Sequence, residues 1–273
     1  MFDPKTTKFP YPDETDGHYI KLKKNNGIVF DKNYPYINNS KLFRFKSWWF
    51  KIFVFLIVLP VVRIRLGFKV VGKENLKKHK ETLKKGVVSC CNHVHYWEYL
   101  GMLSLIMKYE PKFLVWAPNI RGGFGPSMRL LGGIPIPEDD LSASIACSKA
   151  VGKHLEEGGW LHIFAEGSMW EYYKPIRPFK KGLATYACKH NVPVLPFAYT
   201  YRKPGFIRGK IFKQIALFTL HIGEPIYKDE TLPKNEQIID LTKKAHEAVC
   251  KLAGIEDNIY EPLFNNSKKI NYY

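Results

Sequence analysis

Two short polar motifs hold the side chains with which this chain could do chemistry. The first runs from Asn92 to Glu98 (NHVHYWE), and the second runs from Phe164 to Ser168 (FAEGS). In the first motif an imidazole, His93, and a carboxylate, Glu98, are five positions apart. On one continuous helix their side chains would point ~140° apart, so they can meet only if the helix begins after His93. A histidine on a strand-to-helix loop, oriented by a carboxylate, can act as a general base.

Two other interpretations of the first motif stay open. His95 and Glu98 are i,i+3 neighbours on a helix and could pair with each other instead. His93, His95 and Glu98 could also bind a metal ion, which gives a metal-dependent hydrolase as the alternative function. No second ligand cluster is evident, since His154, His162 and His190 have no partners at ligand spacing, so we predict no metal site.

The elements around these motifs alternate between strands and helices. We expect strands at 86–91, 113–116, 160–164 and 192–199, with two more within 211–226, and helices at about 95–108, 141–157, 181–190 and 235–252. Such alternation predicts an α/β fold, a single domain with a mixed, largely parallel sheet covered by helices. His93 and Glu166 each follow a predicted strand directly. Because ligands of such sheets bind beyond the carboxyl ends of the strands, we expect both residues at one edge.

The chain before this domain divides into two parts. Residues 1–40 are rich in Pro, Tyr, Lys, Asp and Asn without a sustained period, which favours an extended arm. Residues 41–66 form a predicted helical segment, for which Ser40 could provide the N-cap. Residues 67–273 then form the α/β domain.

The helical segment contains an uninterrupted apolar run from Ile52 to Val62. As a helix this run measures ~16 Å, against about 30 Å for the hydrocarbon core of a bilayer, so we expect that it does not cross a membrane. Lysines and arginines flank the run, with Trp48 and Trp49 beside them. This pattern favours a membrane-associating helix that lies at the interface or enters one leaflet, and a buried core helix is the alternative.

The net charge and the cysteines indicate what kind of partner the protein binds and in which cellular compartment it is found. Lys and Arg number 42 against 25 Asp and Glu, a net charge of +17, which favours an anionic partner. We expect an anionic lipid surface and no nucleic acid, because no nucleic-acid-binding motif accompanies the charge. Five scattered cysteines predict free thiols in a reducing compartment. With no secretory signal visible in residues 1–40, we expect a peripheral or monotopic protein at the cytoplasmic face of the membrane.

Four motifs together resemble those of the glycerolipid acyltransferases, the 1-acylglycerol-3-phosphate acyltransferase family. Residues 86–199 carry them in the family order: Asn-His-x4-acid, a glycine-rich segment, Phe-x-Glu-Gly-Ser and Val-Pro-Val-Leu-Pro. The resemblance implies a membrane-associated O-acyltransferase of phospholipid biosynthesis. It implies transfer of a fatty acyl group from a thioester donor, acyl-CoA or acyl carrier protein, to the hydroxyl of a lysophospholipid. No further cofactor is implied.

The resemblance also assigns roles to residues of this chain. His93 would be the general base and Glu98 would hold its tautomer. The predicted substrate-binding residues are Arg121, Gly125, Glu166, Gly167, Ser168, Arg177 and Lys180.

This chain departs from the family pattern at three places. Glu98 stands where the family usually has aspartate, Met169 stands where arginine is common, and residues 133–137 lack the arginine that often closes the second motif. Those arginines are thought to bind the acceptor phosphate. Other cations of this chain could substitute for them, namely Arg121, Arg129, Arg177 and Lys180, and the identity of the acceptor stays open.

Overall fold

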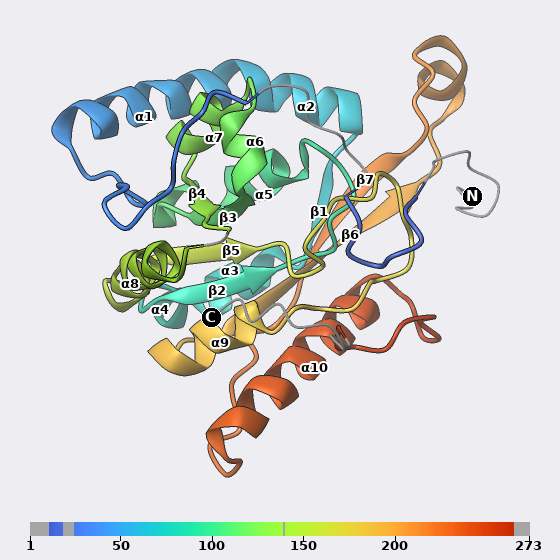
Figure 1. Cartoon of the computed structure of the whole chain (residues 1–273). Coiled ribbons are helices and arrows are strands. Elements are labelled where there is room, and N and C mark those ends of the chain that lie inside the picture. The colour runs from blue at the N-terminus through green and yellow to red at the C-terminus, as the bar shows by residue number, and fades with distance from the viewer. Residues whose placement is uncertain (1–10, 19–24, 139, 265–273) are drawn as a thin grey trace.

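A seven-stranded sheet lies at the centre of the protein (Figure 1). The computed structural model describes residues 11–18, 25–138 and 140–264. Within these residues the strand order is β1-β7-β6-β2-β5-β3-β4, and every neighbouring pair is parallel except β6 and β7. This arrangement confirms the predicted mixed, largely parallel sheet. The strands are β1 (Lys69–Val71), β2 (Val87–Cys90), β3 (Lys112–Trp116), β4 (Gly133–Ile136), β5 (Trp160–Ile163), β6 (Val194–Arg202) and β7 (Leu217–Ile222).

Helices cover both faces of this sheet. Figure 1 shows α5, α6 and α7 above it, with α1 and α2 lying over them, and α9 and α10 below. The helices and helical turns are α1 (Lys41–Phe53), η1 (Val54–Val58), α2 (Leu59–Leu66), α3 (Lys73–Lys78), α4 (Lys80–Leu83), α5 (Glu98–Ile106), η2 (Met107–Tyr109), α6 (Ala117–Arg121), α7 (Gly125–Leu130), α8 (Leu141–Glu156), α9 (Gly182–His190), η3 (Ile207–Ile211) and α10 (Lys234–Leu252). Because both faces are covered, all residues of β2 and β5 are buried, which explains their nearly continuous apolar sequences.

One sequence-based expectation about the sheet is wrong. Two strands were expected within 211–226, but this stretch contains a single strand, β7, and a single bridge at Ile226. The turn before β7 is the π-helical η3, whose isoleucines resemble a strand by composition. The edge strands β1 and β4 were not expected from the sequence.

The predicted helical segment begins at Lys41, and Ser40 caps it by accepting a hydrogen bond from the amide of Phe43 at 3.3 Å. Both features were expected. The helix continues to Leu66 through the π-helical turn η1, in which Leu59 donates to the carbonyl of Val54. Pro60 follows directly. Its ring has no amide hydrogen and would clash with the preceding turn of an α-helix, so the wider turn accommodates it.

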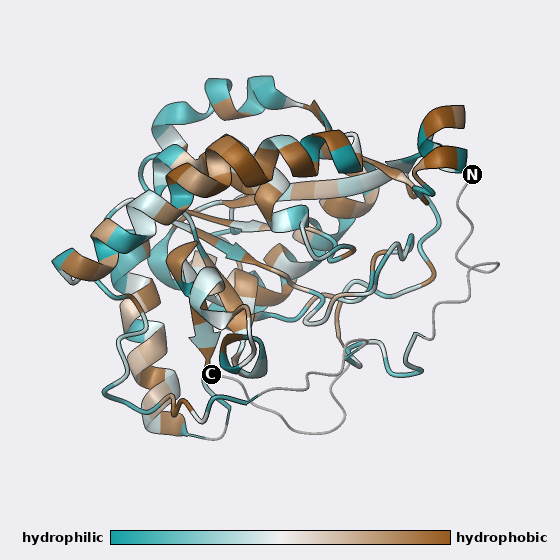
Figure 2. Ribbon diagram, turned by 90° about the horizontal axis from the view of Figure 1, so that it is seen from above, coloured by the Kyte–Doolittle hydropathy of each residue, from teal (hydrophilic) through white to brown (hydrophobic). Residues whose placement is uncertain are grey.

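One side of this segment packs on the domain and the other is exposed. Val54, Leu59 and Val62 are buried, and the Ser47 hydroxyl donates to the carbonyl of Leu130 at 2.6 Å. Figure 2 shows much of this segment as brown, hydrophobic ribbon. Ten large apolar side chains of the segment are exposed: Leu42, Phe45, Trp48, Trp49, Phe53, Phe55, Leu56, Ile57, Val61 and Ile64. Across the described ranges, none of the helices combines the length and the apolar character that a membrane crossing requires.

The proposed arm, residues 1–40, is described only at 11–18 and 25–40, and the rest lies outside the described residues. The described parts contain turns and extended chain with no regular element. The division into arm, helical segment and α/β domain stays a prediction.

A buried histidine in β5 makes the fold sensitive to acid. His162 is fully buried, its Nδ1 lies 2.9 Å from the Ser89 hydroxyl, and burial lowers its pKa to about 3. As the pH falls below 6.5, this histidine becomes protonated in the unfolded chain but stays neutral in the folded chain. The free energy of unfolding therefore keeps its full value above pH 6.5 and decreases below it.

We predict that wild type loses about 2 kcal/mol more unfolding free energy between pH 7 and pH 5 than His162→Gln, which cannot take up that proton. Urea denaturation of both proteins at the two pH values measures this difference. An identical pH dependence for wild type and His162→Gln would contradict the explanation.

Candidate active site

The ring of His93 and the carboxylate of Glu98 are in contact, as the spacing of the first motif predicts. Helix α5 begins at Glu98, so His93 lies in the loop between β2 and α5. Its Nδ1 is hydrogen-bonded to Oε1 of Glu98. The second carboxylate oxygen accepts hydrogen bonds from the amides of Val94 at 2.6 Å and His95 at 2.9 Å. One side chain therefore fixes both the loop backbone and the ring.

The Glu98 side chain is only 1% exposed, so its ionised carboxylate is largely removed from water, which is unfavourable. Burial raises the pKa of its carboxyl group, while His93 and the two loop amides act in the opposite direction. A carboxylate in the first turn also interacts favourably with the positive end of the α5 dipole. An ionised Glu98 can only accept, so the hydrogen bond places the ring proton on Nδ1.

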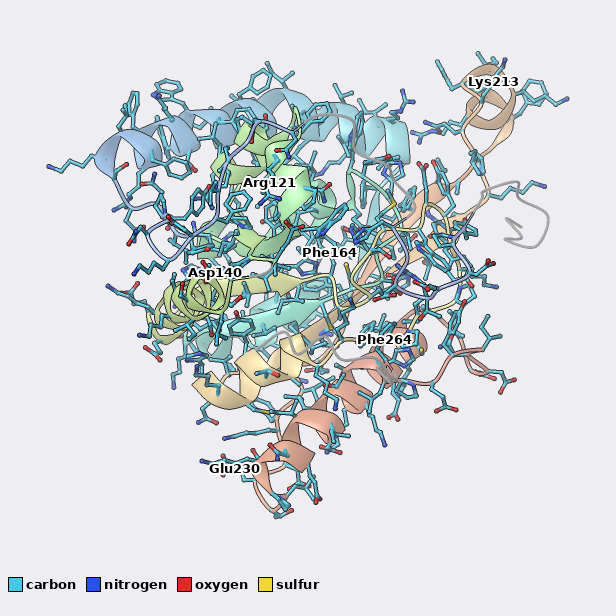
Figure 3. The ribbon with its side chains drawn as sticks, viewed as in Figure 1. Arg121, Asp140, Phe164, Lys213, Glu230 and Phe264 are labelled. Carbon is cyan, nitrogen blue, oxygen red and sulfur yellow. The ribbon has the colours of Figure 1, made fainter. Side chains whose placement is uncertain are left out.

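The other ring nitrogen of His93 is available for chemistry. The imidazole stacks on Phe164 with ring centroids 3.9 Å apart, and 21% of the side chain is exposed. Within the described parts of the chain, Nε2 has no hydrogen-bond partner. With Nδ1 occupied by Glu98, Nε2 carries the lone pair that can accept a proton. Figure 3 labels Phe164 close to the centre of the molecule, where β5 ends.

Asn92 joins the His93 loop to the neighbouring strand β6. Its side-chain oxygen accepts from the amide of Tyr199 at 2.7 Å, and its side-chain nitrogen donates to the carbonyl of Tyr199 at 3.0 Å. The Tyr199 hydroxyl donates in turn to the carbonyl of Glu98 at 2.5 Å. The asparagine that precedes the histidine is thus a positioning residue, a role that the sequence does not reveal.

Glu166 brings the second motif against the first, as expected from their positions after adjacent parallel strands. Its Oε2 accepts from the amide of His93 at 3.1 Å and from the guanidinium of Arg177 at 2.6 Å, and its Oε1 accepts from the amide of Arg177 at 3.0 Å. The carboxylate is 2% exposed. These contacts place Glu166 against neighbouring loop amides, and its predicted contact with substrate stays a prediction.

Arg177 is fully buried beside Glu166, which differs from the sequence-based expectation of a substrate-binding cation. Its guanidinium donates to the Ser168 hydroxyl at 2.8 Å and to the Ser168 carbonyl, and it lies over the Trp170 ring at 4.4 Å. The buried pair joins the residues after β5 to the chain that leads into α9. In this geometry Glu166, Ser168 and Arg177 support the site, and none of the three side chains faces solvent.

Lys180 is more accessible than Arg121 and Arg177. Its side chain is 42% exposed, and its Nζ lies 3.1 Å from a carboxylate oxygen of Asp16. Gly167 has φ +83°, and a Cβ there would lie 2.8 Å from Cε of Lys180. Glycine at this position permits both the left-handed turn and the close approach of the lysine.

Arg121 and Gly125 lie in a different part of the structure. The Arg121 guanidinium pairs with Glu138 at 2.7 Å and donates to the carbonyl of Ile28 at 3.0 Å, and Figure 3 labels it above Phe164. Gly125 begins α7, where a Cβ would lie 1.8 Å from the carbonyl oxygen of Ile120. Both residues therefore have evident packing roles, and their predicted substrate contacts stay predictions.

An N-terminal segment, residues 11–18, contacts the chain that follows the second motif. Trp170 donates to the carbonyl of Gly17 at 2.9 Å, and Arg177 donates to the carbonyl of Thr15 at 2.9 Å. His18 stacks on Trp116 with centroids 3.7 Å apart. An extended arm was expected here, but the sequence does not indicate these partners, because they are distant in sequence and two of them are backbone carbonyls.

The geometry does not support a metal centre at the first motif. His95 accepts from the amide of Trp97 at 3.1 Å, and burial lowers its pKa to about 4. Over residues 11–18, 25–138 and 140–264, no three His, Cys, Asp or Glu side chains are grouped so that they could hold a metal ion. The hydrolase alternative based on His93, His95 and Glu98 therefore lacks a ligand set there.

Comparison with known proteins places this site in a family. Residues 67–200 match the family model described as Acyltransferase, and these residues include both motifs. Over this stretch, which holds the candidate active site, the protein is an Acyltransferase-family domain.

Two individual proteins are similar to it. One is a chloroplastic 1-acyl-sn-glycerol-3-phosphate acyltransferase of Brassica napus, 28% identical over 107 residues, which are 38% of this chain. The chain spans only 30% of the length of that relative. The other is the solved structure of the 1-acyl-sn-glycerophosphate (LPA) acyltransferase PlsC from Thermotoga maritima. It has a TM-score of 0.42 and 18% identity, over 76% of this chain and 94% of that one.

The buried ion pair leads to a stability prediction. Arg177→Met leaves the Glu166 carboxylate buried without its partner, so we expect a loss of about 3–5 kcal/mol in unfolding free energy. Lys180→Met serves as the matched control, because an exposed pair contributes at most about 1 kcal/mol. Urea denaturation measures both losses.

The double variant Glu166→Gln/Arg177→Met removes both charges and should regain part of the stability that Arg177→Met loses. Equal losses for Arg177→Met and Lys180→Met would contradict a structural role for the buried pair.

Proposed function

We propose that this protein transfers an acyl group from a thioester donor, acyl-CoA or acyl carrier protein, to the hydroxyl of a lysophospholipid. The observation that carries the proposal is the His93 imidazole, held through Nδ1 by the buried Glu98, with Nε2 unoccupied. The match of residues 67–200 to the Acyltransferase family supports the reaction class. The Brassica relative, by its name, acylates 1-acyl-sn-glycerol-3-phosphate, and we propose the same class of acceptor for this chain.

In the proposed mechanism His93 is the general base. Nε2 takes the proton from the acceptor hydroxyl as its oxygen attacks the thioester carbonyl carbon. The tetrahedral intermediate then expels the thiolate as the carbon–sulfur bond breaks, and the imidazolium returns the proton to sulfur. The products are an ester and a free thiol.

Glu98 contributes most while the ring is charged. The buried carboxylate forms an ion pair with the imidazolium, and its hydrogen bond keeps Nε2 directed away from the loop. General-base assistance typically contributes about 10²–10⁴-fold to the rate. Positioning of the substrates and stabilisation of the oxyanion must supply the rest of the acceleration.

We propose Lys180 as the residue that contacts the acceptor phosphate. The sequence predicts four cations for this role. Arg177 is buried against Glu166, Arg121 is paired with Glu138, and the Arg129 guanidinium donates to the carbonyls of Pro35, Tyr36 and Gly133. Lys180 is 42% exposed, and its partner is the Asp16 carboxylate of the N-terminal segment. An anionic phosphate could take the place of this carboxylate on the lysine.

We also propose that α1, η1 and α2 bind the membrane that supplies the acceptor, at its cytoplasmic face. The exposed apolar side chains of this segment, Trp48 and Trp49 among them, would enter the interfacial region of the lipid. The net charge of +17 favours an anionic lipid surface. Substitutions that test this proposal are included in the vesicle experiment below.

A labelled acyl-CoA and a labelled acyl carrier protein, each incubated with a panel of lysophospholipids, test the proposed reaction. We predict that wild type forms the diacyl product, and that His93→Gln lowers the rate by at least about 10²-fold with the fold retained by circular dichroism. His95→Gln is the matched control, because His95 lies in the same loop without a proposed catalytic role. Its rate should stay within about 10-fold of wild type.

Two results would contradict the proposal. One is an unchanged rate for His93→Gln. The other is release of free fatty acid as the main product, with equal losses for His93→Gln and His95→Gln, which would favour the hydrolase alternative.

A further inference from the structure

The connection between β6 and β7, residues 203–216, exposes an unusual amount of apolar surface. We call it the β6–β7 loop. It includes the π-helical turn η3, and around this turn four large apolar side chains are 61–70% exposed: Phe206, Ile207, Ile211 and Phe212. Burial of such side chains is favourable. A cluster of four within seven residues therefore indicates a surface that contacts another molecule when the protein functions.

The same loop is basic and contains no acidic residue. Lys203, Lys210 and Lys213 are exposed, and Nζ of Lys210 lies 5.0 Å from the centre of the Phe206 ring. Apolar side chains interspersed with lysines match a lipid interface, where the rings enter the acyl boundary and the ammonium groups contact anionic headgroups. A buried protein–protein contact would instead leave these lysines desolvated without partners, because interface cores are depleted in lysine.

The loop is joined to the end of the α1–η1–α2 segment. Gln214 donates to the carbonyl of Arg65, and Arg202, at the base of the loop, donates to the carbonyl of Gly67. Near this junction α2 exposes Val61 and Ile64. Figure 1 shows the loop rising beside the end of α2 on the side of the molecule where α1 and α2 lie, and Figure 2 shows brown ribbon on both.

We propose that the β6–β7 loop is a second membrane-docking element, which inserts its apolar turn into an anionic lipid surface beside the α1–η1–α2 segment. Two linked attachments bind more strongly than either one alone and restrict the rotation of the domain on the membrane. The proposal extends the proposed membrane association, but it does not depend on the acyl-transfer reaction, because lipid binding can be measured without turnover.

Cosedimentation with vesicles of equal parts phosphatidylcholine and phosphatidylglycerol tests the proposal on the full chain. We expect Phe206→Ser/Phe212→Ser to reduce the vesicle partition coefficient by at least about 10-fold. Leu141→Ser/Ile259→Ser is the matched control, since these two side chains are 72% and 71% exposed elsewhere on the surface. The control should bind as wild type does.

A third variant, Trp48→Ser/Trp49→Ser, tests the α1 attachment in the same assay. It should bind more weakly than wild type, and its combination with Phe206→Ser/Phe212→Ser should bind more weakly than either variant alone. Thermal unfolding midpoints equal to wild type show that the exposed substitutions leave the fold intact.

A fluorescent reporter locates the contact directly. An environment-sensitive dye attached to Phe212→Cys, in a Cys188→Ser background, should shift its emission to the blue when vesicles are added. The same dye on Glu230→Cys should not respond, because Figure 3 places Glu230 at the end of the molecule opposite Lys213.

Several outcomes would overturn the proposal. One is wild-type vesicle binding by Phe206→Ser/Phe212→Ser, and another is an unresponsive dye at position 212. A third is a wild-type dimer in analytical ultracentrifugation that this variant abolishes, which would assign the loop to a second copy of the chain. Acyl transfer with dispersed short-chain substrates is measured separately, so its loss would count against the proposed reaction and not against the docking surface.

Discussion

The buried carboxylate of Glu98 is the constraint on which the rest of the site depends. It accepts three hydrogen bonds, from the His93 ring and from the amides of Val94 and His95. A carboxylate that is 1% exposed is costly to keep ionised, and these donors together with the start of α5 offset the cost. The same contacts determine which nitrogen of His93 bears the proton, so the conformation of the loop and the free lone pair on Nε2 have one origin.

The polar contacts around this loop come from three neighbouring strands. Asn92 follows β2 and is bonded to Tyr199 in β6, while Glu166 follows β5 and accepts from the amide of His93. Because β6, β2 and β5 are adjacent and parallel, the loops that follow β2 and β5 lie beside the carboxyl-terminal half of β6 at one edge of the sheet. Arg177 neutralises Glu166 without reaching solvent. The family motifs therefore contain residues that hold the loop as well as the residue proposed to do chemistry.

The sequence predicts the central elements and the His93–Glu98 contact, because apolar runs and the five-residue spacing are local properties. It does not predict β1, which is three residues long and partly exposed, or β4, where Gly133 and Pro135 interrupt the strand pattern. The burial of Arg177 could not be predicted either. Whether a charged side chain pairs inside the protein or faces a substrate depends on contacts distant in sequence, here with Glu166 and with the carbonyl of Thr15.

The position of the proton on the neutral His93 ring shows whether Glu98 holds the imidazole as a base. Nitrogen-15 NMR of histidine-labelled protein distinguishes a protonated ring nitrogen from one with a lone pair. The His93 signals are assigned by their absence in a variant at that position. We predict that the neutral ring carries its proton on Nδ1 and a lone pair on Nε2. A neutral ring protonated on Nε2 would show instead that Glu98 does not hold the imidazole as a base.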